Sequence, residues 1–375
     1  MDQEFDLIAE KVRNGERLTW EDGRVLFHHH NLPELASLAD IVRKRWNPEN
    51  CVTYVVGRNI NYTNVCWVRC KFCAFYRIPG NDEGYVLPKD VILEKIRQMV
   101  ENGGIEILMQ GGLNPKLKIE WFEDLFMAIK SHFGDWRVIL HALSPAEIIY
   151  IAKISRLSLE DCILRLQNAG LDSIPGGGAE ILTDHVRQQI APYKDTADEW
   201  LECMRVAHKV GLRTTITMMY GSVDNWEDRL EHLMRTRQLQ DETGGFTAFI
   251  PWSFQPDGTE LKGSRASGFD YLRTVAVSRI ILDNIPHIQA SWVTQGPRIA
   301  QIALSYGVDD FGSTMMEENV VSSAGCSFTM PIDELEYTIR AAGYQPMRRT
   351  TQYVLLPLGV PDNSPYLTMH PLNSH

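Results

Sequence analysis

Hydrophobic and polar positions change their spacing along the chain in a regular way. After the first fifty or so residues, short apolar runs typical of buried strands alternate with longer stretches whose apolar residues lie three or four positions apart, as on one face of a helix. The eight predicted strands are residues 52–60, 105–110, 137–142, 171–174, 213–220, 246–252, 288–293 and 309–315. A strand followed by a helix, repeated in this way, predicts a parallel sheet with helical crossovers.

The size of this repeat favours one α/β fold. Eight strand–helix units over roughly 300 residues fit a (β/α)8 TIM-type barrel better than an open sheet with helices on both faces. The apolar signal of the fourth and eighth predicted strands is weak, so a six-stranded partial barrel is an alternative. The sequence also does not determine whether the first and last strands pair to close the barrel. No linker rich in Ser or Gly divides this region, which we therefore expect to form one domain.

The two ends of the chain have a different pattern from the repeat. Helical spacing near the N-terminus predicts short helices at residues 5–12, 24–30 and 32–46. Thr19 and Asp22 have the spacing of a capping box at the start of the second helix. We therefore expect an N-terminal helical extension (residues 1–50), the barrel (51–343) and a C-terminal tail (344–375) that packs on the barrel or frays.

Composition and charge narrow the class of protein. The 375 residues include 37 Lys and Arg against 48 Asp and Glu, a formal net charge of −11, so no broad basic surface is expected to bind nucleic acid. Hydrophobic residues make up 44%, which is enough for a large core. No apolar run resembles a signal sequence or a membrane-spanning helix of about 18 residues. We expect a cytoplasmic protein that acts on a small molecule.

Three of the seven cysteines lie close together just after the first predicted strand. Cys66, Cys70 and Cys73 have the spacing C-x3-C-x2-C. Three thiolates on one loop can hold three corners of an iron–sulfur cube, and no fourth cysteine lies nearby to hold the last corner. An open metal position binds external ligands, which favours catalysis. A zinc site completed by a histidine from residues 28–30 is the alternative, although zinc ligands usually come in two separated pairs.

This loop resembles the signature of the radical S-adenosylmethionine (SAM) enzymes, in which an aromatic residue, here Phe72, precedes the last cysteine. The resemblance implies a 4Fe-4S cluster on Cys66, Cys70 and Cys73, with S-adenosyl-L-methionine on the unique iron. It also implies a one-electron donor such as flavodoxin or ferredoxin. In such enzymes the cofactor supplies a 5′-deoxyadenosyl radical that takes a hydrogen atom from the substrate.

Further cofactor contacts are expected at other strand ends. Gly111 and Gly112 resemble the family's "GGE" position, which meets the methionine amino group, but leucine follows them here instead of glutamate, so only a backbone contact is expected. Glu180 follows a run of glycines and is expected to accept hydrogen bonds from the ribose or the ammonium group of the cofactor. Tyr220 is a candidate to stack on an aromatic ring, and Pro256 resembles the region that borders the adenine.

Longer segments resemble one branch of this family, the futalosine-pathway enzymes of menaquinone biosynthesis. The segments QGGLNP (110–115), HALSP (141–145) and FIPWSFQP (249–256) look like those of its cyclase. This implies that dehypoxanthine futalosine is the substrate, that ribose C4′ loses hydrogen, and that this carbon closes a ring onto the benzoate. An aminofutalosine synthase is the nearest alternative. A non-catalytic iron–sulfur electron-transfer protein is the alternative from another class.

The implied reaction needs a partner for the substrate carboxylate and a group that accepts the final proton. Arg77 and Arg298 lie beside strand ends and are candidate carboxylate ligands, and Trp252 is a candidate to stack on the benzoate. The titratable groups at strand ends, and so the candidate bases, are His141, Glu317 and Glu318. Because adjacent glutamates cannot both point into one pocket, we expect only one of this pair to act.

Overall fold

The computed structural model describes residues 2–134, 137–326 and 328–356. All eight predicted strand segments contain strands, and the first of them divides into two strands at Val56. The strands are β1 (Cys51–Val55), β2 (Gly57–Ile60), β3 (Glu106–Met109), β4 (Ile139–Ala142), β5 (Ser173–Ile174), β6 (Arg213–Tyr220), β7 (Phe246–Ser253), β8 (His287–Ile288), β9 (Asp310–Ser313) and β10 (Gln345–Arg348).

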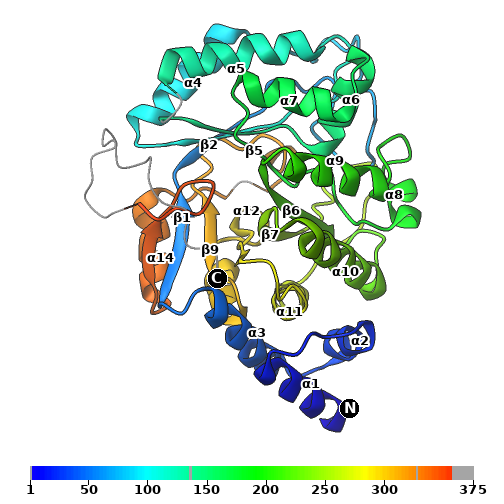
Figure 1. Ribbon diagram of the computed structural model, residues 1–375, viewed down its shortest axis with the longest axis vertical. Coiled ribbons are helices and arrows are strands. Elements are labelled where there is room, and N and C mark those ends of the chain that lie inside the picture. The colour runs from blue at the N-terminus through cyan, green and yellow to red at the C-terminus, as the bar shows by residue number, and fades with distance from the viewer. Residues whose placement is uncertain (1, 135–136, 327, 357–375) are drawn as a thin grey trace.

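The strands form two parallel sheets, one of three strands (β10, β1, β9) and one of seven, which together curl around the centre of the molecule (Figure 1). Seven of them, β2 to β8, pair in sequence order. β1 leads into β2 and pairs in parallel with β9, and Ala290, just past β8, donates its backbone N–H to the Asp310 carbonyl of β9 (2.8 Å). The eighth segment, β9, therefore pairs with the first segment on one side and contacts the end of the seventh on the other. The predicted α/β barrel fold is confirmed, and more than six strands take part.

Helices surround this sheet, and α1 to α3 lie together at one end (Figure 1). The helices are α1 (Asp2–Asn14), α2 (Trp20–His28), α3 (Leu32–Trp46), α4 (Lys89–Glu101), α5 (Ile119–Phe133), α6 (Pro145–Ser155), α7 (Leu159–Ala169), α8 (Asp184–Ile190), α9 (Ala197–Lys209), α10 (Trp226–Thr243), α11 (Gly268–Ile281), α12 (Trp292–Gln295), α13 (Pro297–Ala303) and α14 (Ile332–Ala341). None of the helices in the described ranges is long and apolar enough to cross a membrane. The predicted capping box is present, because Thr19 Oγ1 accepts from the Asp22 N–H (3.3 Å).

Two predicted elements differ from the structure. The strand expected at 288–293 ends at Ile288, since the Ser291 N–H donates to the Tyr271 hydroxyl (2.8 Å) and the chain turns into α12. The helical spacing between the third and fourth predicted strands, which predicts one helix at 145–170, belongs to two helices, because Arg156 adopts the left-handed conformation (φ 58°) and ends α6. Both differences arise where a local residue or a contact from another element interrupts a regular apolar pattern.

Both ends of the described chain pack against the barrel. Arg43 of α3 is buried and donates to the carbonyl oxygens of Val308 (3.1 Å) and Cys51 (2.9 Å), which joins the N-terminal helices to the sheet. At the other end, β10 pairs with the free edge of β1. The predicted domain boundaries stay predictions, and the tail beyond residue 356 lies outside the described residues.

Candidate active site

A cavity of about 390 Å³ lies at the carboxyl ends of the strands and extends between them into the barrel. Its wall takes side chains from successive strands, such as Asn59 of β2, His141 of β4, Thr217 of β6 and Trp252 of β7. Parallel strands bring their carboxyl ends to the same rim, which is where barrels of this type place their reactive groups. The barrel therefore gathers residues from the whole chain around one space.

The loop after β2 brings the three predicted ligand cysteines to this cavity. Cys66, Cys70 and Cys73 are free thiols, and all three line the cavity wall. The loop is closed at both ends by backbone hydrogen bonds, since Cys66 donates to the Arg77 carbonyl (2.8 Å) and Cys73 donates to the Cys70 carbonyl (3.1 Å). Three sulfurs are thus held around one space by a fixed backbone.

The electrostatics of these sulfurs fit a cationic metal group. Burial raises the pKa of Cys66, Cys70 and Cys73, while the charge of Lys194 acts in the opposite direction on Cys66 and Cys70. Neutral thiols are favoured until a cation replaces their protons, so metal binding and thiol ionisation are coupled. Buried thiols on one loop are a donor set typical of an iron–sulfur cluster.

A single zinc ion fits the same residues less well. Among the described residues, no group of three His, Cys, Asp or Glu side chains converges on one metal position. His28, a candidate from the predicted zinc alternative, packs instead against Trp226 at the N-terminal end of the fold. An iron–sulfur cube takes each cysteine at a different corner, so it does not need sulfurs that converge on a point.

The two glycines after β3 allow the cysteine loop to pack closely. A Cβ on Gly112 would lie 2.4 Å from the carbonyl oxygen of Val65 and 2.8 Å from the Cβ of Cys66. On Gly111, a Cβ would lie 2.7 Å from the ring of Tyr62. Both positions line the cavity, but their lack of a side chain first serves contact within the protein, and the expected backbone contact with the methionine amino group stays a prediction.

Glu147, in the first turn of α6, is a cavity residue that sequence reasoning missed. Its carboxyl accepts hydrogen bonds from the Gly111 N–H (3.0 Å), the Tyr62 hydroxyl (2.7 Å) and the Ser144 hydroxyl (2.6 Å). Burial nevertheless raises the pKa of Glu147 to about 7. The available signal was Ser144 three residues before a glutamate, the spacing of a helix N-terminus.

Glu180 lines the cavity and forms an ion pair with Lys194, another residue that sequence reasoning missed, while its expected hydrogen bonds to the cofactor stay a prediction. The two side chains are only 7% and 8% exposed. Burial opposes the charge of Lys194, but Glu180 and Cys70 outweigh it and raise the pKa of Lys194. Nζ of Lys194 also lies 5.8 Å from the ring centroid of Phe72. A charged and aromatic corner therefore lies beside the cysteines.

His141 lies deeper in the cavity and is neutral. Its Nδ1 is 2.9 Å from Oγ of Ser173, and the Ser173 hydroxyl donates to the Arg213 carbonyl (2.8 Å). Ser173 must then accept from the Nδ1–H of His141, which leaves the lone pair on Nε2. Burial, and to a smaller extent the charge of Arg349, lower the pKa of His141 to about 3. As it stands, His141 is a weak candidate base and a good hydrogen-bond acceptor.

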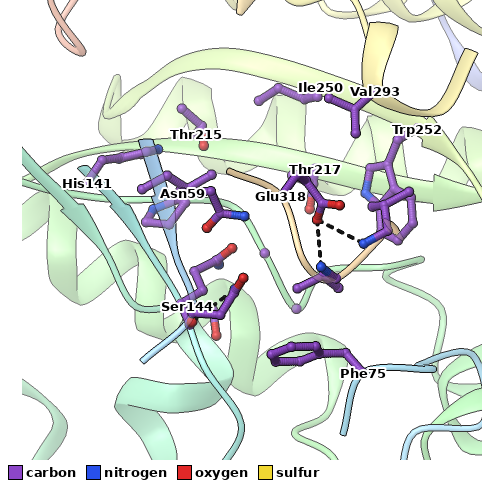
Figure 2. Close-up of a pocket in the computed structure, with 18 of the residues that line it drawn as sticks. Asn59, Phe75, His141, Ser144, Thr215, Thr217, Ile250, Trp252, Val293 and Glu318 are labelled. Atoms are coloured by element: carbon purple, nitrogen blue, oxygen red, sulfur yellow. Dashed lines mark hydrogen bonds between the residues drawn. The ribbon is translucent and has the colours of Figure 1, made fainter. Parts of the chain in front are cut away.

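The structure separates the two neighbouring glutamates. Glu318 lines the cavity, and its carboxylate accepts from the backbone N–H groups of Val320 and the next two residues at 2.8 to 2.9 Å. Two of these hydrogen bonds are drawn in Figure 2. Glu317 instead forms ion pairs with Arg58 (2.8 Å) and Lys95 (2.7 Å) and is not among the described residues that line the cavity. Of this pair, only Glu318 is placed to meet a ligand.

The two predicted arginines also lie away from the described cavity wall. Arg77 pairs with Glu83 (2.5 Å) and donates to three carbonyl oxygens of residues 74–76, so it braces the end of the cysteine loop. Arg298 is exposed on α13. The cations on the described cavity wall are Lys194 and Arg349, which the sequence did not single out.

Of the three residues predicted to contact an aromatic ring or the adenine, one lies on the described cavity wall and two do not. Trp252 lines the cavity, whereas Tyr220 and Pro256 are not among the described lining residues. Tyr220 is fully buried, with the guanidinium of Arg229 lying 4.5 Å from its ring centroid. The Pro256 carbonyl accepts from the backbone N–H of Thr259 (3.2 Å), which makes this segment a turn, and also from the Thr259 hydroxyl (2.8 Å).

Matches to known families agree with the fold and the cysteine loop. Residues 60–235 match the radical SAM superfamily, and residues 243–361 match the CofH/MqnC C-terminal region. The fold is similar to that of methylornithine synthase, with a TM-score of 0.73 and 19% identity over 91% of this chain and 97% of that one. It is also similar to the hydrogenase maturase HydG from Carboxydothermus hydrogenoformans, with a TM-score of 0.75 and 16% identity over 94% and 81%. Barrel, rim loop and family match together define a radical SAM enzyme.

Sequence relatives place the chain more narrowly. It is 47% identical to a cyclic dehypoxanthine futalosine synthase of Halalkalibacterium halodurans over 94% of this chain and 95% of the relative. It is 44% identical to the enzyme of that name from Streptomyces coelicolor, over 94% and 90%. An aminodeoxyfutalosine synthase of Thermus thermophilus is 41% identical over 92% and 94%. The chain belongs to the family of cyclic dehypoxanthine futalosine synthases, which confirms the resemblance found in the sequence.

Proposed function

We propose that this enzyme converts dehypoxanthine futalosine to its cyclic product in menaquinone biosynthesis. The proposal rests on one combined observation. This chain is 47% identical to a cyclic dehypoxanthine futalosine synthase, and its own three signature cysteines line one cavity of the barrel. In the reaction, ribose C4′ loses a hydrogen atom and bonds to the benzoate ring. The hydrogen atom would go to the 5′-deoxyadenosyl radical, and the ring radical would then give one proton to a base and one electron to a one-electron acceptor, so the product has two hydrogen atoms fewer than the substrate.

The cofactor residues follow from the cavity wall. The residues that would hold a 4Fe-4S cluster are Cys66, Cys70 and Cys73. When bound, the cluster and S-adenosyl-L-methionine supply a 5′-deoxyadenosyl radical. Glu180 and Lys194 present one negative and one positive group in a fixed, buried pair, which would bind the oppositely charged groups of the methionine or the hydroxyls of its ribose. Gly111 and Gly112 line the same wall and let the end of β3 pack closely against Tyr62 and the cysteine loop.

The remaining groups would act on the substrate. Trp252 and Phe75 line the cavity and supply apolar surface for an aromatic ring. Glu318 is the candidate that accepts the final proton, because its carboxylate lies at the wall and burial raises its pKa. A carboxylate with a raised pKa holds a proton more readily at neutral pH. A small one-electron carrier such as flavodoxin or ferredoxin would reduce the cluster.

The test is anaerobic incubation of the reconstituted protein with dithionite, S-adenosyl-L-methionine and dehypoxanthine futalosine, followed by mass spectrometry. We expect 5′-deoxyadenosine together with a product two hydrogen atoms lighter than the substrate. The Cys70→Ser variant serves as the inactive control. Formation of 5′-deoxyadenosine with no such product would contradict the proposal.

A further inference from the structure

The cavity has two walls of different chemical character (Figure 2). Polar groups lie along one wall, where the labelled residues are Asn59, His141 and Thr215. Apolar side chains lie along the other, where the labelled residues are Ile250, Trp252 and Val293. The cavity therefore suits a ligand with one polar end and one apolar end.

The polar wall contains hydrogen-bond acceptors that a ligand can satisfy. Asn59 is only 6% exposed, and within the described part of the chain its Oδ1 has no hydrogen-bond partner. Nε2 of His141 carries a lone pair, because Nδ1 donates to Ser173. A buried acceptor without a partner is unfavourable, so the Asn59 oxygen and the free lone pair of His141 favour a ligand group that donates hydrogen bonds to this wall.

The floor of the cavity, formed by Glu106, Arg349 and Thr351, disfavours an anionic ligand. Nε and Nη2 of Arg349 already donate to the carboxylate of Asp310, at 2.5 and 2.8 Å. Glu106 accepts from the Thr351 hydroxyl (2.7 Å) and leaves a second carboxyl oxygen. A carboxylate placed here would meet two acidic side chains and a cation that is already paired, whereas a neutral hydroxyl would meet acceptors.

We propose that Asn59 and His141 form a subsite that accepts hydrogen bonds from the hydroxyl groups of a sugar, while the apolar wall at Trp252 takes the aryl end of the same molecule. The subsite rests on the proposed function for its ligand, because dehypoxanthine futalosine carries a hydroxylated ribose and a benzoate. It gives His141 a role in binding and orienting the ribose in place of the predicted role as a base.

The test measures the affinity of the cluster-loaded, SAM-bound protein for dehypoxanthine futalosine and for its 2′-deoxy and 3′-deoxy analogues, by anaerobic titration calorimetry. Wild-type protein should lose about tenfold in affinity when a hydroxyl that reaches the subsite is removed. Asn59→Ala and His141→Ala should each weaken the parent ligand by about tenfold, and removal of the matching hydroxyl should then cost nothing further.

Trp252→Ala is the matched control from the opposite wall. It should weaken the parent and the deoxy analogues by the same factor, because the aryl contact does not depend on the hydroxyl groups. Equal affinity of wild-type protein for the parent and both analogues would overturn the subsite, and this result needs no variant to fold. Free benzoate serves as a probe of the aryl site. If Asn59→Ala loses benzoate binding while Trp252→Ala keeps it, the proposed placement of the aryl end at Trp252 is overturned.

Failure of the proposed function gives a different result. Wild-type protein that distinguishes the parent from its deoxy analogues, but forms no cyclic product with dithionite present, would overturn the proposed reaction and support the subsite. Wild-type protein that forms the cyclic product and binds all three ligands equally would overturn the subsite and support the reaction.

Discussion

The Arg349–Asp310 ion pair ties the C-terminal segment to the barrel floor, and we predict that Arg349→Met lowers the free energy of unfolding by about 3–5 kcal/mol. Arg349 follows β10 and is 3% exposed, while Asp310 of β9 is 0% exposed. Asp310 also accepts from the Thr53 hydroxyl (2.6 Å) and the Gly312 N–H (2.8 Å). In the variant, the buried carboxylate of Asp310 would lose its cation and keep these two neutral hydrogen-bond donors.

The expected magnitude follows from charge separation and burial. Two unit charges about 4 Å apart attract each other by about 4 kcal/mol at an effective dielectric constant of about 20. Methionine keeps much of the apolar volume of the arginine stem, so the loss is mainly electrostatic. Since folded domains are stable by only about 5–15 kcal/mol, the change should be a large share of the total.

Guanidinium chloride denaturation, followed by tryptophan fluorescence and circular dichroism, measures the loss. The matched control is Arg340→Met on α14, where the arginine side chain is 59% exposed and pairs with Glu336 (2.7 Å). An exposed pair of this kind contributes less than about 1 kcal/mol. The double variant Arg349→Met/Asp310→Asn should be more stable than Arg349→Met alone, since it buries no unpaired carboxylate. A loss below about 1 kcal/mol for Arg349→Met would refute the reasoning.

Three other changes test the site. Gly112→Ala should lower the iron content of reconstituted protein, because its Cβ would lie 2.4 Å from a carbonyl of the cysteine loop, whereas Gly268→Ala, which meets only the Ile299 side chain, should not. Iron and sulfide analysis should find no cluster in Cys70→Ser and a normal content in Cys203→Ser; loading of Cys70→Ser would contradict the ligand assignment. As the pH rises from 4.5 to about 7, the wild-type free energy of unfolding should fall by about 3 kcal/mol more than that of Glu147→Gln. The reason is that Glu147 keeps its proton in the folded state over this range and loses it in the unfolded state. Equal pH slopes in denaturation would refute this origin.

The barrel could be predicted because its signal is local. A buried strand needs only a short apolar run, and the predicted strand at 213–220 coincides with β6. The prediction was wrong at residues 291–293, which continue an apolar run but enter α12. There the Ser291 N–H donates to the hydroxyl of Tyr271, which belongs to α11. The hydropathy of residues 291–293 cannot predict a hydrogen bond to a side chain from another helix.

The candidate site could be predicted only where its residues are neighbours in sequence. The spacing of Cys66, Cys70 and Cys73 identified their loop, since ligands on one loop share one location. The ion pair of Lys194 with Glu180 could not be predicted from the sequence. Lys194 lies in the loop between α8 and α9, and no regular spacing relates it to Glu180. Arg77 is close to the rim in sequence, yet its side chain turns to Glu83 and the loop carbonyls, and sequence position does not reveal that direction.

The backbone at Glu180 indicates that this carboxylate is positioned before any ligand binds. Glu180 has a φ of 45°, a left-handed conformation that is unfavourable for a residue with a side chain. Its carbonyl accepts from the Met219 N–H (2.9 Å), and the buried Arg187 donates to the Ala179 carbonyl (2.6 Å), so the turn is fixed from both sides. The Lys194 ion pair fixes the carboxylate itself. A charged group held in this way needs little reorganisation when a polar ligand arrives, which is how preorganised sites gain affinity.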